Sequence, residues 1–310
     1  MPAAENLVPL ATHVCGGAGR IDLVEYLSRV HNAMQRDLPS LADLRDSQRG
    51  GTLLICGGGP SIGDVVQIKA IRALAKKGAK VWAVNKTHDF LLTKGITPWA
   101  ACLLDPMPWV AGYIRKPQKN TIYAVASQCD AGVFDALKRA NVYVWHAGVD
   151  YGGQGYPVSV LEAQYPGRDW LVVPGPTTVG LRSVLVGYAL GFRHFHLFGL
   201  DSSMRVATGN ADQAAAKLHA YAKPKPADAP EGWVTLRASG ADRNFFTNAH
   251  MARQALDFEE TVENIGAMVK SGAMEPMTLA VHGEGLLPTL AGCYGWHVDD
   301  NGAAATRRAS

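Results

Sequence analysis

From Thr52 onward, short apolar runs alternate with segments whose apolar residues recur at helical spacing, and this alternation constrains the fold most. The first run is Thr52–Cys56 (TLLIC), and the following segment, Ile62–Lys77, has apolar residues at positions 65, 68, 71 and 74. Strands of a parallel sheet are buried on both faces and are connected through helices. The sequence therefore predicts an α/β fold, a Rossmann-like, mainly parallel, doubly wound sheet with helices on both faces.

The same alternation continues through most of the chain. Further apolar runs predict strands at Lys80–Val84, Trp99–Leu104, Thr121–Ala126, Val142–Trp145, Trp170–Val173, His194–Phe198 and Met277–Val281. Helical spacing predicts helices at Ile21–Met34, Asp89–Lys94, Val133–Ala140, Val179–Leu190 and Met251–Val269. For the first of these helices, Asp22 is expected in the first turn, and no clear N-cap residue precedes Ile21.

The predicted domain organisation follows from where the alternation starts and stops. Residues 1–50 are expected to form a helical preamble that ends in a polar linker, and residues 51–300 a nucleotide-binding, transferase-like domain. An irregular insertion is expected around 202–247, because Lys223–Pro230 (KPKPADAP) is rich in proline. The tail 301–310 is expected to be disordered.

Composition excludes several classes of protein. Lysine and arginine number 30 against 27 acidic residues, a net charge of +3, which disfavours nucleic-acid binding through bulk charge. No apolar run approaches the roughly 20 residues of a membrane-spanning helix. The first residues lack the pattern of a signal peptide. The five cysteines are scattered without a CxxC pair, which favours a reducing compartment, and a cytoplasmic protein is therefore expected.

The first strand-to-helix turn is rich in glycine. It reads Cys56-Gly-Gly-Gly-Pro-Ser61-Ile-Gly-Asp64, and Ser61 with Asp64 resembles a capping box that would start a helix. A glycine turn before a helix suits a nucleotide or phosphate, and the alternative is a tight turn alone. The loop lacks the Gly-Lys-Ser/Thr ending of a Walker A motif and does not fit GxGxxG. Because the second strand ends in Asn85 and not in an acidic residue, a dehydrogenase is disfavoured.

Three further strands end in polar residues, namely Asn85, Asp105 and Asp201. Ligands of open α/β sheets bind beyond the carboxyl ends of the strands. Each of these residues could instead cap a local turn. Three of them at equivalent positions, together with the glycine loop, favour a shared ligand site.

In their order, the segments CGGGPS, VWAVN, GITPWAACLLDP and GPTTVGLRSVLVGYALGFRHFHLFGLD resemble the MptE-like family. That family includes archaeal 6-hydroxymethylpterin diphosphokinases. It is similar in turn to motility accessory factors and to bacterial sialyltransferases that use CMP-sialic acid. The resemblance covers about Thr52 to Asp201, with a weaker echo at ALDFEETV and GEGLLP between Met251 and Pro288. Similar proteins occur in bacteriophage genomes, which is compatible with a phage-encoded member.

The resemblance implies a set of site residues and a reaction class. Carried over by position, the residues that bind the nucleotide are Gly57, Gly58, Gly59, Pro60, Ser61, Asn85, Thr177, Thr178 and Gly180. Asp105 and Asp201 would act in catalysis, and His250 lies near the segment where the sialyltransferases carry a general base, although Thr247 or Asn248 aligns closer to it. The ligands implied are a nucleotide or nucleotide-sugar and a small-molecule or glycan acceptor, with Mg²⁺ if the reaction is diphosphoryl transfer from ATP.

Other polar residues admit two interpretations each. His194 and His196 face the same side of one strand, which suits metal ligation or, more simply, a structural role, since no third ligand is evident. Arg182, in the first turn of an apolar helix, could pair with a phosphate or extend to the surface.

The sequence therefore favours a nucleotide-dependent transferase that carries out glycosyl or diphosphoryl transfer. Two alternatives remain open. One is a non-catalytic accessory or phage protein that retains the nucleotide fold, and the other is a SAM-dependent methyltransferase.

Overall fold

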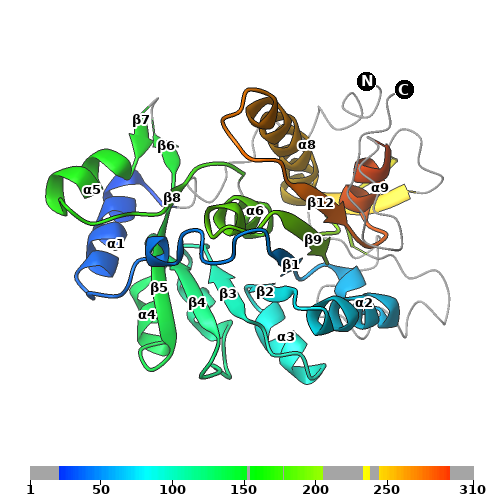
Figure 1. Cartoon of the computed structure of the whole chain (residues 1–310), viewed down its shortest axis with the longest axis horizontal. Helices are drawn as coiled ribbons and strands as arrows, with labels where there is room; N and C mark the ends of the chain where they lie inside the picture. The colour runs from blue at the N-terminus through cyan, green and yellow to red at the C-terminus, as the bar shows by residue number, and fades with distance from the viewer. Residues whose placement is uncertain (1–20, 152–153, 177, 205–232, 238–243, 294–310) are drawn as a thin grey trace. The chain divides into compact units, whose positions relative to one another are not determined.

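The computed structural model describes residues 21–151, 154–176, 178–204, 233–237 and 244–293 (Figure 1). The chain divides into two compact units. The sheet unit contains residues 21–55 and Gly78–Arg193, and the loop unit contains Cys56–Lys77 and the described residues from His194 onward. Thr177, the predicted tail 301–310 and most of the predicted insertion around 202–247 lie outside the described residues.

The sheet unit follows the predicted alternation. Its strands are β1 (Thr52–Cys56, the last residue joining the loop unit), β2 (Lys80–Val84), β3 (Ala100–Leu103), β4 (Ile122–Ala126), β5 (Asn141–Ala147) and β8 (Val172–Val173). Their order in the sheet is β1-β2-β3-β4-β5-β8, and the registers from β2 to β8 are parallel. Its helices are α1 (Leu23–Met34), α3 (Thr87–Thr93), α4 (Ala131–Ala136), α5 (Val158–Gln164) and α6 (Val179–Ala189), and β6 (Val149–Tyr151) and β7 (Gln154–Tyr156) form an antiparallel hairpin.

Helices cover both faces of this sheet. Trp82 of β2 donates its indole N–H to Ser183 of α6 over 3.0 Å, so its side chain points to the face that α6 covers. Tyr123 of β4 pairs in register with Ala101 and not with Ala100, the partner of Trp82, and therefore points to the other face. There its hydroxyl lies 3.1 Å from His88 Nε2 of α3. Figure 1 shows α3 and α6 on different sides of the strands.

The loop unit combines one parallel strand pair with α8, a helix of 22 residues. Strand β9 (His194–Phe198) pairs with β12 (Thr278–Val281), and His196 lies opposite Ala280. The helices are α2 (Val65–Lys76), α8 (Ala249–Lys270) and α9 (Leu286–Cys293), and β10 (Trp233–Arg237) pairs antiparallel with β11 (Asn244–Asn248). With eight strands in a mainly parallel sheet, the predicted Rossmann-like α/β fold is confirmed.

Two predicted helix starts are wrong. Asp22, expected in the first turn of a helix that starts at Ile21, is instead the N-cap of α1 and accepts the amide of Glu25 over 2.8 Å. Helix α2 begins at Val65, after a short 3₁₀ helix over Pro60–Gly63, and not at Ile62. The near capping box does not form, because Ser61 hydrogen-bonds to a residue 140 positions away.

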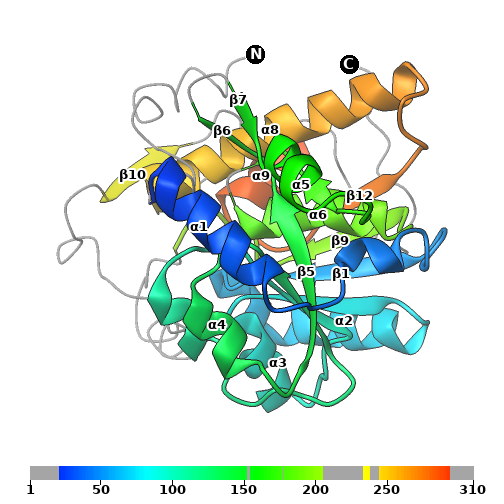
Figure 2. The same cartoon turned by 90° about the vertical axis from the view of Figure 1, so that its left-hand side faces the viewer.

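The preamble and the predicted linker pack within the sheet unit. Tyr26, Val30 and Met34 of α1 form an apolar cluster with Leu161 of α5, near which α1 lies in Figure 2. The linker segment runs along the end of α6, where three of its amides donate to consecutive carbonyls: Asp46 to Ala189, Gln48 to Leu190, and Gly50 to Gly191. Within the described ranges, no helix is long and apolar enough to cross a membrane.

Candidate functional site

The glycine loop packs directly on the end of β9. The amide of Gly57 donates to the carbonyl of Phe198 over 2.8 Å, and the amide of Gly59 donates to the carbonyl of Gly199 over 2.7 Å. A Cβ at Gly57 would lie 2.6 Å from the Gly199 carbonyl oxygen, and a Cβ at Gly59 would lie 2.7 Å from the same atom. Two backbone segments therefore approach too closely for any side chain, which accounts for glycine at both positions.

Asp201 holds this loop in place through hydrogen bonds to Ser61. Its side chain is 3% exposed, and its Oδ2 accepts both the amide of Ser61 over 2.9 Å and the hydroxyl of Ser61 over 3.0 Å. Hydrogen bonds to a buried carboxylate are stronger than those between neutral groups. The predicted residues Gly57, Gly59, Ser61 and Asp201 are thus brought together, with Pro60 buried in the same turn.

A second glycine segment, whose residues are not among the predicted site residues, completes this arrangement. Gly283 has a φ of +116°, and a Cβ there would lie 2.6 Å from Ser61 Oγ and 3.0 Å from Asp201 Oδ1. The amide of Leu287 donates to the Asp201 carbonyl over 3.1 Å. The motif GEGLLP was the available signal, because its glycines are needed where the chain passes over Asp201.

His282, directly before Gly283, pairs with His196 of β9. His196 Nδ1 and His282 Nε2 are 2.9 Å apart, and the His282 ring stacks on Phe198 with centroids separated by 4.1 Å. Burial lowers the pKa of both imidazoles to about 4, and a neighbouring histidine adds to the effect in each case. The two rings are therefore neutral at pH 7.

The metal interpretation of His194 and His196 finds no support. His194 is exposed and pairs with Thr278 Oγ1 over 2.9 Å, while His196 pairs with His282. No group of three His, Cys, Asp or Glu side chains in the described part of the chain is placed to hold a metal ion. The structural interpretation accounts for both residues.

The candidate general base lies at the start of α8. His250 is exposed at the second position of this helix. Of the two residues that align closer to the relatives' base, Asn248 is the N-cap and accepts the amide of Met251 over 3.0 Å, and Thr247 is buried and donates its hydroxyl to the Ser202 carbonyl over 2.9 Å. The contacts of Asn248 and Thr247 hold the helix start in place.

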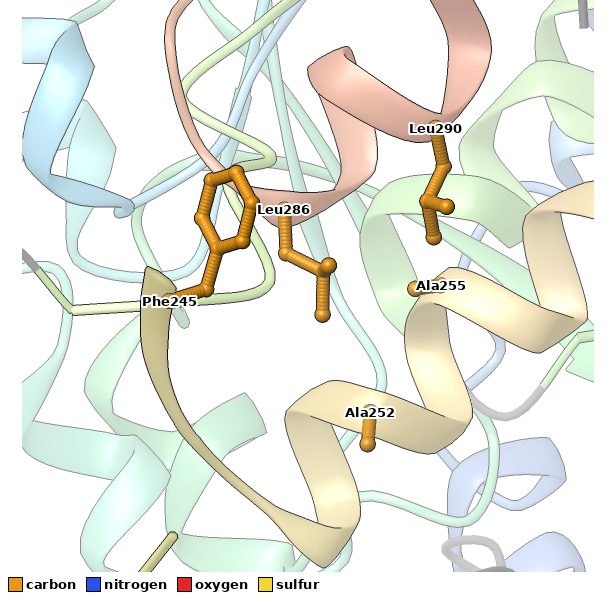
Figure 3. Close-up of a cluster of buried hydrophobic side chains, with 5 residues drawn as sticks. All are labelled: Phe245, Ala252, Ala255, Leu286 and Leu290. Carbon is orange, nitrogen blue, oxygen red and sulfur yellow. The ribbon is translucent and has the colours of Figure 1, made fainter. Parts of the chain in front are cut away.

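Helix α8 is positioned by a small apolar cluster. Ala252 and Ala255 of α8 belong to one buried cluster with Leu286 and Leu290 of α9 and Phe245 of β11 (Figure 3). The short alanine side chains allow the two helices to approach closely. On the same helix, Gln254 Oε1 accepts the hydroxyl of Ser202, which directly follows Asp201. The cluster holds the start of α8 against α9, and the hydrogen bond of Gln254 holds it beside Ser202, which follows β9.

The remaining predicted residues lie in the sheet unit. Asn85 adopts a left-handed φ of +53° at the end of β2, a conformation that asparagine tolerates better than most residues. Asp105, half-buried after β3, accepts the amide of Met107 over 3.0 Å in a local turn. Thr178 is the N-cap residue of α6, and Gly180 is buried in its first turn. Asn85 and Asp105 therefore both shape the turns in which they lie.

The interpretation of Arg182 as a surface arginine is wrong. The residue is 6% exposed, so it neither extends to the surface nor presents its charge to solvent. Its guanidinium donates to the carbonyls of Pro176 over 2.9 Å, Gly175 over 2.7 Å and Gly148 over 3.2 Å. Buried carbonyls need donors, and this one side chain supplies them for the segment between β8 and α6 and for Gly148 after β5.

Comparison with known proteins places the chain in a family. The family model described as 6-hydroxymethylpterin diphosphokinase MptE-like matches residues 27–206. A solved structure of the MAf glycosyltransferase from Magnetospirillum magneticum AMB-1 has the same fold, with a TM-score of 0.52 and 18% identity. The match covers 77% of this chain and 34% of that one, so the chain spans about a third of that protein's length. No curated protein matches the chain. Because the family model covers more than half of its residues, the chain belongs to the MptE-like family.

Proposed function

We propose that the chain is a nucleotide-dependent transferase. Two findings support a transferase. The description of the family names a diphosphokinase, an enzyme that transfers a diphosphoryl group. The solved structure with the same fold is described as a glycosyltransferase. The proposed donor is a nucleotide-sugar or ATP, and the proposed acceptor is a small molecule or a glycan.

The arrangement of the glycine loop on Gly199–Asp201 carries the proposal. It lies at the carboxyl end of β9, the edge at which open α/β sheets bind their ligands. The amides of Gly57, Gly59 and Ser61 already donate within the protein. The proposed contact with the nucleotide is therefore the half-buried backbone of Gly58, where the absence of a side chain allows close approach.

The protein's own residues would act mainly by positioning. In this proposal, Ser61 and Asp201 keep the loop rigid, so that the nucleotide is held in one orientation for in-line displacement. Asp105, Asp201 and His250 are the proposed catalytic residues, and the side chain of His250 is exposed. Thr178 and Gly180, at the start of α6, are proposed nucleotide contacts with Asn85.

In this proposal, the substrate would hold Mg²⁺ together with the protein. Among the described residues, no group of three His, Cys, Asp or Glu side chains is placed to hold a metal ion, and Oδ2 of Asp201 already accepts two hydrogen bonds from Ser61. Mg²⁺ can instead be bound through one or two carboxylates together with substrate phosphates. In diphosphoryl transfer, the ion would therefore arrive with ATP as part of the substrate, and loss of activity in a chelator would separate this reaction from metal-independent glycosyl transfer.

A thermal-shift panel tests the proposal. The full chain is heated with CMP, a CMP-sugar, ATP, GTP or SAM, each compared with buffer alone. At least one nucleotide is expected to raise the unfolding midpoint, because a ligand that binds only the folded state stabilises it. Gly58→Leu is expected to abolish that shift. Gly266→Leu is the matched control, since position 266 is exposed and open, and it should keep the shift.

The other outcomes select the alternatives. A shift with SAM alone would favour a methyltransferase. No shift with any compound would favour a non-catalytic accessory protein. A shift that survives in Gly58→Leu would show that the nucleotide does not bind at this loop.

A further inference from the structure

Three buried oxygen atoms follow neighbouring strands of the sheet unit and lack a hydrogen-bond partner in the part of the chain that the structure describes. They are Asn85 Oδ1 after β2, Thr87 Oγ1 at the start of α3, and Gln128 Oε1 after β4. Thr87 and Gln128 are each 3% exposed. Buried polar atoms are almost always paired in folded proteins, so a group of unpaired acceptors indicates a partner from outside the chain.

The orientation of the Gln128 amide is fixed. Its Nε2 donates to the Leu104 carbonyl over 3.0 Å, and a carbonyl can accept only from the nitrogen end of the amide. The unpaired atom must therefore be the oxygen. The backbone is held as well, since Arg29 donates to the carbonyl of Gln128 over 3.3 Å and also to that of Pro106. Gln128 is thus tied to the chain that continues from β3.

Two of these residues, Asn85 and Gln128, are hydrogen-bonded to β3 or to the residue that follows it. The backbone amide of Asn85, after β2, donates to the Cys102 carbonyl. The side-chain Nε2 of Gln128, after β4, donates to the Leu104 carbonyl. Carbonyls two residues apart on an extended strand are separated by about 7 Å, and adjacent strands by about 4.8 Å. Asp105 follows Leu104 at the same edge. The backbone of Asn85, the side chain of Gln128 and Asp105 therefore meet at the carboxyl end of β3.

The chemistry of this edge selects the ligand. The amide oxygens of Asn85 and Gln128 are acceptors, the hydroxyl of Thr87 can accept, and Asp105 adds a carboxylate. Such a set repels a phosphate and favours O–H or N–H donors. We propose that the side-chain oxygens of Asn85, Thr87 and Gln128 form a subsite of hydrogen-bond acceptors. This subsite would bind an uncharged part of the substrate that carries hydroxyl or amino groups. This deepens, and rests on, the proposed transferase function. The donors could come from sugar hydroxyls or from the amino group of a nucleobase.

Thr87→Val tests the subsite, because it keeps the shape of the side chain and removes only the hydroxyl. Thr87 Oγ1 has no partner in the described chain, so the variant is expected to unfold at the wild-type temperature or above it. The matched control is Thr121→Val, in which an equally buried hydroxyl that donates to the Pro98 carbonyl over 2.7 Å is lost. That control should unfold at a lower temperature and bind ligands as the wild type does.

Binding is measured by calorimetry with cytidine, uridine and N-acetylglucosamine. At least one probe is expected to bind, and Thr87→Val is expected to weaken it about tenfold, the loss of one hydrogen bond. Equal binding of cytidine and uridine would identify ribose hydroxyls, binding of cytidine alone the amino group, and binding of N-acetylglucosamine alone a sugar subsite.

Four results would overturn the subsite. In the binding measurements, these are that no probe binds, or that Thr87→Val binds every probe as the wild type does. In the unfolding measurements, they are that Thr87→Val is destabilised as much as Thr121→Val, or that Mg²⁺ stabilises the chain and no probe does.

The two proposals can fail separately. Sugar binding that depends on Thr87, without any nucleotide shift, would keep the subsite and reject the proposed function. A nucleotide shift that depends on Gly58, with probe binding unaffected by Thr87→Val, would do the reverse.

Discussion

At the residue scale, several polar side chains that suggest ligand binding in the sequence also have structural roles. Asn85 turns the chain at a left-handed φ, and Arg182 satisfies backbone carbonyls before α6. A strand-end position identifies a residue near the ligand edge, yet it does not show which of its atoms are already bonded. Unpaired buried atoms such as Thr87 Oγ1 are therefore visible only in three dimensions.

The neutral histidines predict a pH dependence of stability. His146, His196 and His282 have folded pKa values of about 4, below the ordinary value of 6.5, mainly through burial. As pH falls below 6.5, the unfolded chain takes up protons that the folded chain does not, so stability should decrease from about pH 6.5 toward pH 4 and stay level above 6.5. Urea unfolding at pH 7, 6 and 5 measures this slope.

Two variants assign that slope to residues. His282→Gln removes one titrating ring and keeps a hydrogen-bonding side chain for His196, so the slope between pH 6.5 and 5 should become shallower. His146→Gln removes another ring whose folded pKa is about 4, and it should also make the slope shallower. An unchanged slope in His282→Gln would mean that this ring titrates normally in the folded state.

At the element scale, the sequence predicts strands better than helix starts. A buried strand such as β2 is a continuous apolar run, so its bounds can be read locally. The start of α2 depends on Ser61, whose partner Asp201 is 140 residues away, and no local pattern contains that contact. The pairing of His196 with His282, 86 residues apart, was missed for the same reason.

The contact between the glycine loop and the end of β9 predicts the effect of Gly57→Ala. The added Cβ would meet the Gly199 carbonyl oxygen at 2.6 Å, and backbone atoms on both segments would have to move. A destabilisation of about 1–3 kcal/mol is expected, as for other overpacked sites. Gly266→Ala has open space in α8 and should instead stabilise the chain by about 0.5–1 kcal/mol. Urea unfolding compares the two, and equal stabilities would show that the loop does not pack on Gly199 as described.

At the scale of the whole molecule, the fold was predictable and the chemistry was not. The alternation of apolar runs and helices specifies an α/β sheet, and the order of the motifs indicated the family. Hydrogen bonds within the protein determine which loop amides remain for a ligand, and those of Gly57, Gly59 and Ser61 are already used. Since one fold supports many reactions, the substrate depends on such details of the site.

A crystal structure of the chain with the nucleotide that gives the largest thermal shift tests the central claim most directly. The account predicts that the phosphates of the nucleotide contact the backbone of Gly58 while Ser61 remains bonded to Asp201. A nucleotide bound elsewhere, with the loop of Gly57–Ser61 free of ligand, would contradict it.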